Sequence, residues 1–414
     1  MARASRKSAA KTAVPPPTAE QLTDDMSRLG PQEAADALEQ VSDELALDVL
    51  QRLNPASTGD IIPELDDEMR RRLFAAGPAR VTRQWTINQE FGEDSIGRLM
   101  EPPSAVFRPT QTIGDVAATV RDLVKTTFVT YCFVTDDTER LVGIVTMRDL
   151  VVADPGTMLG DVMLRDVFSL TPSMPLTDAM KSVLNRHFPI YPVCNDAGKL
   201  IGLVRGQAMF EEQAFEISAQ PGRMVGVDKE ERLATPWQRS VKFRHPWLQL
   251  NLFTAFLAAA VVGIFQHTLD RMVILALFLP VLAGQSGNTG CQALAVTLRG
   301  LTLGELRRGA ERALVAKEAL LGLINGALVG ITAGVGMYIV ARMQSNAAAL
   351  TLGVCVTLAM IGSCVVSGIC GAIIPLTLRK AGADPATASS IFLTTATDVV
   401  SMGMFLALAT ALLP

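Results

Sequence analysis

The chain has 414 residues, of which 49% are hydrophobic and 19% charged, and its formal net charge is −4. This length allows two or three domains, and the six cysteines, without a CxxC pair or a neighbouring histidine cluster, support neither a disulfide framework nor a zinc site. Most charged residues lie within residues 1–246, whereas Leu, Ala, Val, Gly and Ile dominate from Trp247 onward, so the two halves are expected to occupy different solvents.

The first residues are not expected to form a domain. Residues 1–18 are basic, small and rich in proline, without the apolar core of a secretory signal, and we interpret them as a disordered leader. A helical domain is expected over residues 19–98. Its apolar residues recur at helical spacing, with predicted breaks at Pro31, Pro55 and Pro63, and short helices of this kind stack as a small superhelix.

An internal repeat follows this domain. Residues 128–151 and 187–210 align with an offset of 59, and each copy predicts a strand, an acidic turn, a strand and a helix. The repeat resembles a tandem pair of CBS domains, which we place at residues 99–160 and 161–220. That resemblance implies an α/β fold and possible binding of an adenosine nucleotide. A connecting helix is expected over residues 221–246.

Residues 247–414 are predicted to form an all-α transmembrane domain. Apolar runs long enough to cross a bilayer suggest five spans: Trp247–His267, Met272–Gln292, Leu314–Val340, Ala347–Leu378 and Ala386–Leu413. The predicted fold class is therefore multi-domain, with an α-helical superhelix, an α/β CBS pair and a five-span helical domain.

The arginines and lysines around the spans predict the orientation. One set of flanks carries most of the positive charge: Arg239, Lys242, Arg244, Arg299, Arg307, Arg308, Arg312, Arg379 and Lys380. The alternate loops hold only Arg271 and Arg342. By the positive-inside rule, the N-terminal half is cytoplasmic and the C-terminus lies outside.

The second span ends in a glycine-rich stretch, "FLPVLAGQSGNTGCQ". Gly284, Gly287 and Gly290 do not form a phosphate loop, because no GK[ST] follows and the context is a membrane span. Together with Pro280 they indicate a broken or closely packed helix, and Asn288 adds a neutral oxygen suited to a hydrated cation. The alternative is a helix–helix contact between small residues.

The last span holds one charged residue, Asp398. A carboxylate at mid-bilayer costs about 2.5–3.5 kcal/mol on insertion scales, so such a group usually faces water or a partner. Asp398 is therefore either part of an ion path or a packing partner of another helix.

These features together resemble the MgtE family of magnesium channels. The resemblance covers the chain from about Ala19 and is most specific in residues 278–301 and 379–409. It implies a homodimer in the bilayer with one pore, lined by the second and fifth spans. The implied pathway residues are Asp398, which would select magnesium, Gly284, Gly287 and Asn288 in a turn, and Ser390, where relatives often have Asn. The implied Mg²⁺ sensor carboxylates are Glu211, Glu212, Glu216 and Asp384.

We therefore expect a magnesium-selective channel or transporter for passive Mg²⁺ entry across the plasma (inner) membrane, regulated by cytoplasmic domains that sense Mg²⁺. Two alternatives stay open: a membrane-anchored CBS ligand sensor without transport, and a broader transporter that also takes Mn²⁺, Co²⁺ or Ni²⁺. No enzyme is expected, because no nucleophile–base constellation or nucleotide-hydrolysis motif occurs, and no nucleic-acid partner is expected.

Overall fold

The computed structural model describes residues 18–125, 127–186, 188–306 and 309–413. The chain divides into two compact units. The first comprises residues 1–212 and 232–235, and the second comprises residues 213–231 and 236–414. The expected leader lies almost wholly outside the described residues, as do Arg307 and Arg308 of the orientation argument.

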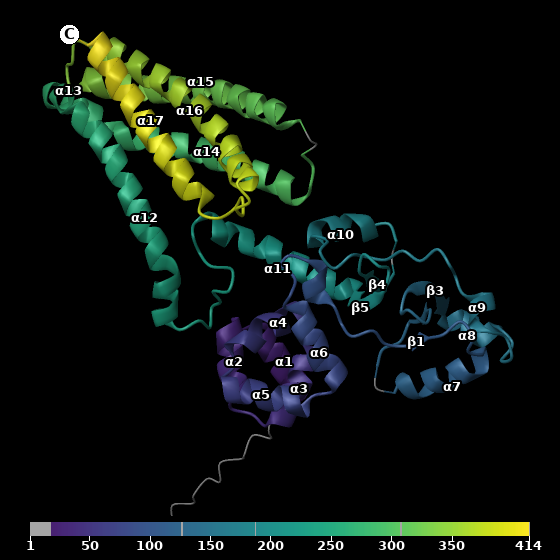
Figure 1. Ribbon diagram of the computed structural model, residues 1–414. Helices are drawn as coiled ribbons and strands as arrows, with labels where there is room; N and C mark the ends of the chain where they lie inside the picture. Colours follow the sequence, from purple (N-terminus) through teal and green to yellow (C-terminus); the bar gives the residue numbers. More distant parts are fainter. Residues whose placement is uncertain (1–17, 126, 187, 307–308, 414) are drawn as a thin grey trace, which may run out of the picture. The chain divides into compact units, whose positions relative to one another are not determined.

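The described N-terminal part of the first unit is a stack of short helices (Figure 1). They are α1 (Ala19–Ser27), α2 (Pro31–Leu38), α3 (Asp43–Arg52), α4 (Pro55–Glu64), α5 (Asp67–Ala76) and α6 (Ala79–Asn88). Pro31 and Pro55 stand at the first position of a helix, where the missing N–H costs nothing. Pro63 lies inside the last turn of α4, so the break predicted there comes two residues later.

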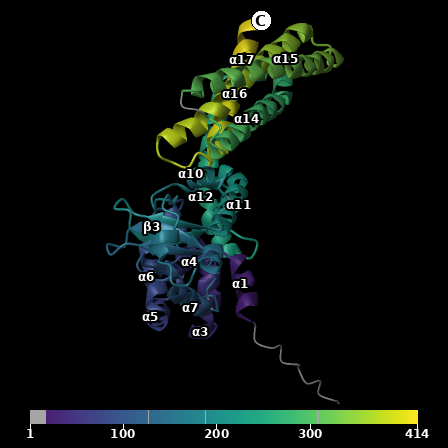
Figure 2. The same ribbon diagram turned by 90° about the vertical axis from the view of Figure 1, so that its right-hand side faces the viewer.

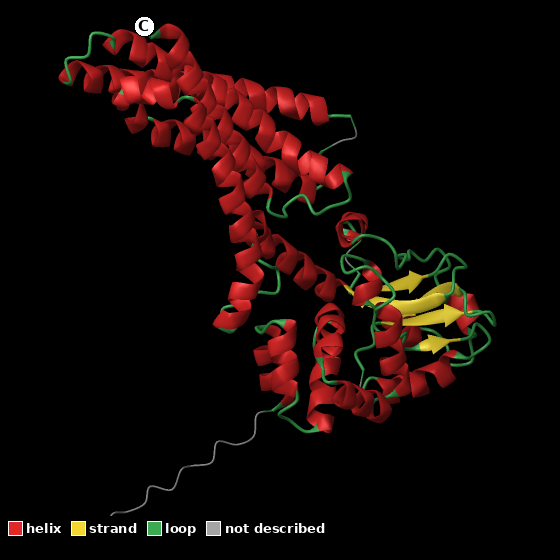
Figure 3. Ribbon diagram, turned by 60° about the vertical axis from the view of Figure 1, so that its left-hand side comes forward, coloured by secondary structure: helices red, strands yellow, loops and turns green. Residues whose placement is uncertain are grey.

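The strands of the first unit belong to the repeat and lie close together (yellow in Figure 3). The first copy contains η1 (Ile96–Leu99), β1 (Val106–Phe107), α7 (Ile113–Leu123), β2 (Tyr131–Thr135), β3 (Leu141–Thr146) and α8 (Met147–Val152). The second contains α9 (Leu159–Val162), α10 (Leu176–Val183), β4 (Ile190–Cys194), β5 (Leu200–Arg205) and the start of α11 (Gly206–Met224). β1 pairs with β2 in parallel, while β2–β3 and β4–β5 are antiparallel.

The two copies of the repeat share details of strand pairing and turn hydrogen bonding at positions 59 residues apart. Both hairpins have a register shift near the end of the first strand, between Val134 and Thr135 and between Val193 and Cys194. In the turn of the first hairpin Asp136 Oδ1 accepts the backbone N–H of Arg140 at 2.9 Å, and in the second Asn195 Oδ1 accepts that of Lys199 at 3.0 Å. The strand–turn–strand prediction is confirmed in both copies.

The two copies share a small core. Phe133 of β2 is buried together with Ile190 of β4 and Leu203 of β5, so apolar side chains of both hairpins meet. Backbone hydrogen bonds join the copies as well, from Leu141 N to Gly198 O at 3.0 Å and from Leu200 N to Glu139 O at 3.1 Å. The repeat therefore folds as a pair rather than as two independent modules.

The connecting segment differs from the expectation. A single helix was predicted over residues 221–246, but α11 runs from Gly206 to Met224 and α12 begins only at Trp237. Gly226 in the intervening loop has φ +80°, and a Cβ placed there would lie 2.6 Å from Cγ of Trp247. The loop thus turns tightly against α12 at a position that requires glycine.

The second unit contains long helices (Figures 1 and 2). They are α12 (Trp237–Ile264), α14 (Leu279–Thr302), α15 (Glu311–Met343), α16 (Ala349–Lys380) and α17 (Ser389–Leu412), with the short α13 (Gln266–Arg271) and η2 (Val273–Leu277) before α14. Among the described residues, five segments are long and apolar enough to span a membrane, as predicted. The first begins ten residues earlier than expected and the second continues to Thr302.

Helix α14 packs closely against α16 and α17. A Cβ on Gly371 of α16 would lie 2.5 Å from the carbonyl oxygen of Gly290, and a Cβ on Gly290 would lie 2.9 Å from Cδ1 of Leu393 in α17. Glycine is therefore required at Gly371, because a side chain there would collide with the backbone of α14. A side chain at Gly290 would force Leu393 to shift. The small residues in this stretch do form helix–helix contacts, as one of the two interpretations proposed.

Candidate functional site

Asp398 lies in the middle of α17, half-buried in the second unit. Within the described ranges, no hydrogen bond or ion pair reaches its carboxylate. Thr394 lies one turn earlier on the same helix face, and Met402 one turn later, and both are also half-buried. The described residues thus offer the Asp398 carboxylate no hydrogen-bond or ion-pair partner.

The glycine-rich stretch is helical rather than a turn. Gly284, Gly287 and Asn288 all lie within the continuous helix α14, and the backbone break falls earlier, at Phe278 between η2 and α14. The turn expected over residues 284–288 was therefore wrong. A continuous helix satisfies its own backbone hydrogen bonds, which is the condition for crossing lipid.

One face of α14 is uncovered in the isolated chain. Its exposed residues recur at spacings of three and four, and they are Val281, Gly284, Asn288, Gln292 and Ala295. A Cβ placed on Gly284 would meet nothing within 4 Å. Two amide side chains therefore lie on a helix face that contacts no other part of the described chain closely.

Gly287 connects this helix with the Asp398 region. A Cβ on Gly287 would lie 3.9 Å from Oγ1 of Thr397, the residue that precedes Asp398. Helices α14 and α17 thus lie close together at Gly287 and Thr397.

Ser390 has a different neighbourhood. Its hydroxyl donates a hydrogen bond of 2.7 Å to the backbone carbonyl of Met224, the last residue of α11. Ser390 therefore lies at a junction between α11 and α17, two turns from Asp398 along the helix.

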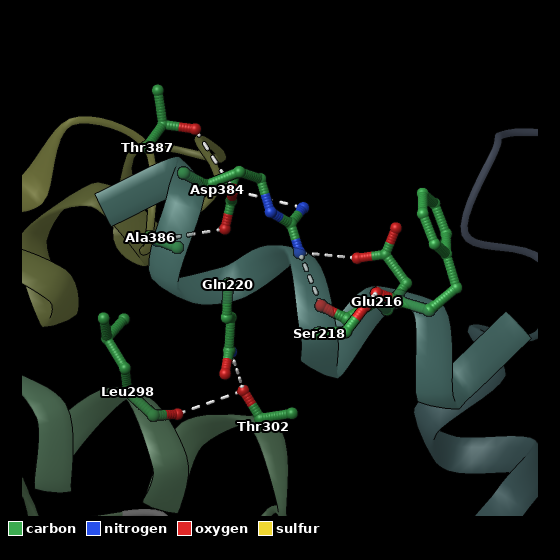
Figure 4. Close-up of polar contacts among 10 residues, drawn as sticks. Glu216, Ser218, Gln220, Leu298, Thr302, Asp384, Ala386 and Thr387 are labelled. Atoms are coloured by element: carbon green, nitrogen blue, oxygen red, sulfur yellow. Dashed lines mark hydrogen bonds and ion pairs between the residues drawn. The ribbon is translucent and has the colours of Figure 1, made fainter. Parts of the chain in front are cut away.

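The expected sensor carboxylates are not gathered into one site. Among the described residues, no group of three or more histidine, cysteine, aspartate or glutamate side chains is placed to hold a metal ion. Glu216 and Asp384 both contact Arg223, whose Nη2 lies 2.6 Å from Glu216 Oε2 and whose Nη1 lies 3.4 Å from Asp384 Oδ2 (Figure 4). In the first unit, Glu211 accepts a hydrogen bond of 2.8 Å from Gln207.

Arg223 is the residue that the sequence reasoning missed. One signal was available, because Arg223 follows Glu216 by seven residues, which is two helical turns and places both on one face of α11.

A cavity of about 620 Å³ opens within the first unit. Three arginines line it, Arg80 and Arg83 from α6 and Arg108 after β1, together with Glu139. Arg108 Nη1 donates to the carbonyl and to the hydroxyl of Thr135 at 3.1 and 3.0 Å, which fixes its side chain at the wall.

Comparison with protein families gives matches in both units. A family model described as "MgtE: Divalent cation transporter" matches residues 279–408, which include the whole of α14, α15 and α16 and most of α17. CBS domain models match residues 96–156 and 159–211.

Similar individual proteins agree with these matches. The chain is 29% identical over 315 residues to the magnesium transporter MgtE of Enterococcus faecalis, covering 75% of this chain and 68% of the relative. It is 27% identical over 330 residues to the magnesium transporter MgtE of Thermus thermophilus, covering 78% and 71%.

Among solved structures, the cytosolic domain of the Mg²⁺ channel MgtE in complex with ATP matches with 24% identity and a TM-score of 0.42, over 47% of this chain and 80% of that one. The sequence matches, together with the five long apolar helices, also mark the chain as an integral membrane protein. This chain belongs to the MgtE family of magnesium transporters, with a CBS pair followed by five candidate membrane helices.

Proposed function

We propose that the protein conducts Mg²⁺ passively across the membrane and that Asp398 is the ion-binding carboxylate of the pathway. The observation that carries the proposal is the half-buried Asp398 in an apolar helix, without a partner among the described residues. A carboxylate in that setting normally faces water or an ion, since a bare charge in hydrocarbon is costly.

The chemistry of Asp398 suits a hydrated magnesium ion. Mg²⁺ prefers oxygen ligands in octahedral geometry and gives up its water reluctantly, so it is commonly held by one or two carboxylates through several waters. Two Asp398 side chains, one from each chain of a symmetric dimer, supply such a site. An ion held through water is released more readily than one held directly, as conduction requires.

The uncovered face of α14 is the surface that we assign to the rest of the pathway. Gly284 and Asn288 are exposed in the isolated chain, and Gly287 lies near Thr397 beside Asp398. In a homodimer this face would look onto the symmetry axis, where the Asn288 amide oxygen is available to the water shell of the ion. We assign Ser390 to the junction between α11 and α17, because its hydroxyl donates a hydrogen bond to the Met224 carbonyl.

Uptake by proteoliposomes tests the assignment. We expect Mg²⁺ flux with the wild type and a loss of about tenfold or more with Asp398→Asn, because a charge contact at about 4 Å is worth about 1 kcal/mol even in bulk water and more for a divalent ion near protein. Asp270→Asn is the matched control, since Asp270 is exposed on α13, outside the five candidate spans. Normal flux and selectivity in a folded Asp398→Asn protein would refute the assignment.

The same assay separates the alternatives. Absence of flux in the wild type, with folded protein and intact CBS ligand binding, would favour a membrane-anchored sensor. Uptake of Mn²⁺, Co²⁺ or Ni²⁺ at rates similar to that of Mg²⁺ would favour a broader divalent cation transporter.

We further propose that the N-terminal half is cytoplasmic, that the protein resides in the plasma (inner) membrane, and that Mg²⁺ regulates transport through α11. Support comes from the charge asymmetry of the loops and from the path of α11, which follows directly after β5 and ends in contact with the first turn of α17. Glu211 and Glu212 remain candidates for cation binding, whereas Glu216 and Asp384 already contact Arg223.

The arginine-lined cavity favours a second ligand, an adenosine nucleotide. Its volume of about 620 Å³ lies in the range of small-molecule sites, and arginines bind phosphates well. We expect Arg83→Gln to weaken binding of a fluorescent ATP analogue to the purified protein. Arg121→Gln, an exposed arginine of α7 that does not line the cavity, should leave it unchanged.

A further inference from the structure

The last turns of α11 hold one guanidinium between two carboxylates (Figure 4). Arg223 uses different nitrogens for its two partners: Nη2 lies 2.6 Å from Glu216 Oε2, and Nη1 lies 3.4 Å from Asp384 Oδ2. Glu216 belongs to α11 itself, whereas Asp384 belongs to the loop between α16 and α17. Arg223 thus links a helix to a loop far along the chain.

The three side chains are largely shielded from water. Arg223, Glu216 and Asp384 are 19%, 18% and 34% exposed. Charge-assisted hydrogen bonds in such a setting are stronger than those between exposed groups. Without a cation between them, the two carboxylates would repel each other, and Arg223 supplies that positive charge permanently because guanidinium does not lose its proton in proteins.

Backbone contacts join the same two segments. The carbonyl of Arg223 accepts the N–H of Ala388 at 2.9 Å, and the carbonyl of Met224 accepts the hydroxyl of Ser390 at 2.7 Å. The free carbonyls at the C-terminal end of α11 therefore receive donors from the start of α17, which satisfies groups that every helix end leaves open. Ala388 has φ +49°, so the chain turns sharply where this contact forms.

Apolar packing and one side-chain contact complete the junction. Met224 packs against a cluster that includes Leu294 of α14 and Leu393 of α17. Gln220 of α11 also hydrogen-bonds to the hydroxyl of Thr302 at the end of α14 (labelled in Figure 4). The end of α11 is thus fixed to both helices that we assign to the ion pathway.

We propose that Arg223 is a built-in cation that closes this junction, so that α11 stays attached to the start of α17 without a bound divalent ion. A divalent cation is not needed between Glu216 and Asp384, since their charges are already engaged. It is also disfavoured there, because it would have to displace or approach the positive guanidinium. Regulation by Mg²⁺, which belongs to the proposed function, would then have to act on groups other than this pair.

Hydrogen exchange of the full-length protein in nanodiscs, followed over residues 381–390, tests the proposal in EDTA and in millimolar Mg²⁺. We expect equally slow exchange of the wild type in both solutions. In EDTA, Arg223→Gln should exchange on the order of tenfold faster, because hydrogen bonds to charged groups are worth more than neutral ones. The control is Arg342→Gln, the same substitution in the last turn of α15, which should exchange as slowly as the wild type.

A charge reversal distinguishes loss of the bridge from loss of the fold. In Arg223→Glu/Asp384→Arg the guanidinium stands in the loop and still faces two carboxylates, so slow exchange in EDTA should return even where Arg223→Gln alone folds poorly. The proposal is overturned if the wild type exchanges slowly only with Mg²⁺, if a folded Arg223→Gln protein exchanges as slowly as the wild type, or if the reversed pair stays fast. None of these readouts depends on ion flux, so failure of the transport proposal would be recognised separately.

Discussion

The hydroxyl of Ser390 donates a hydrogen bond of 2.7 Å to the backbone carbonyl of Met224, although the two residues are 166 positions apart in the chain. The contact joins the first turn of α17, which carries Asp398 further along, to the last residue of α11, which begins directly after the CBS strand β5. A movement of the end of α11 would therefore displace the start of α17, the helix that we assign to the ion pathway.

Removing the Ser390 hydroxyl should loosen this contact without changing selectivity. Ser390→Ala leaves the Met224 carbonyl without its donor, at an expected cost of about 1 kcal/mol. Amide exchange in residues 388–392 should rise about fivefold, while the preference for Mg²⁺ over Na⁺ in liposomes stays unchanged. Ser401→Ala is the control, because Ser401 bonds only to the Asp398 carbonyl of its own helix. A loss of selectivity in Ser390→Ala would instead make Ser390 a pathway ligand.

Two glycines of α14 should respond in opposite ways to the same substitution. Gly290→Ala places a methyl group 2.9 Å from Leu393, so we expect a loss of about 1–3 kcal/mol and a lower thermal midpoint in detergent. Gly284→Ala meets nothing within 4 Å and should keep or raise that midpoint, since alanine favours helix. If Gly284 lines the pathway, its substitution should nevertheless reduce Mg²⁺ flux. Full flux in Gly284→Ala would remove this residue from the pathway.

Labels at the two ends of α16 should react from opposite sides of the membrane. Gln344→Cys and Ala383→Cys place a thiol at exposed positions before and after this helix. With a membrane-impermeant maleimide, the first should be labelled in intact cells and the second only after permeabilisation, each measured above the wild-type background. The reverse pattern would contradict both the orientation and the cytoplasmic location of the CBS pair.

The loop between α11 and α12 should loosen in acid. Glu231 is only 3% exposed and pairs with Arg244 through two contacts of 2.6 and 3.0 Å. The hydrogen bond from Arg244 lowers the pKa of Glu231 below its usual value. The pair therefore stabilises the loop above the pKa of an unfolded glutamate, about 4.3, and the stabilisation is lost as the pH falls through the lowered pKa of the folded state.

Trp247 can report on this change, since it lies against Gly226 of the same loop. In a Trp85→Phe/Trp237→Phe background, its fluorescence should shift as the pH falls below the usual pKa of a glutamate. Glu231→Gln should show the shifted signal already at neutral pH, with little further change in acid. A pH-independent signal in the protein that keeps Glu231 would rule out the pair as the stabilising contact.

The sequence by itself determined the elements whose signal is periodic. The repeat offset predicted both CBS hairpins, because apolar strands and the turn between them are encoded locally. The structure adds that Asp136 and Asn195 accept backbone N–H groups in the two turns. The five candidate spans were predicted for a similar reason, since length and hydropathy are properties of each segment alone. The breaks predicted at Pro31 and Pro55 likewise coincide with the starts of α2 and α4.

Tertiary structure decided the features that depend on neighbours. The glycines in residues 284–290 indicated a broken or closely packed helix, and α14 is the second: it continues through them, with Gly290 packed against Leu393 of α17 and its carbonyl oxygen close to Gly371 of α16. A helix that spans a membrane also satisfies its own backbone hydrogen bonds. The sequence also did not predict the end of α11 at Met224 or the start of α12 at Trp237. Nor did it predict the role of Arg223, which forms ion pairs with a carboxylate on its own helix and with Asp384 in a distant loop. No local pattern records a contact of that kind, since it exists only after the bundle has brought the α16–α17 loop to the end of α11.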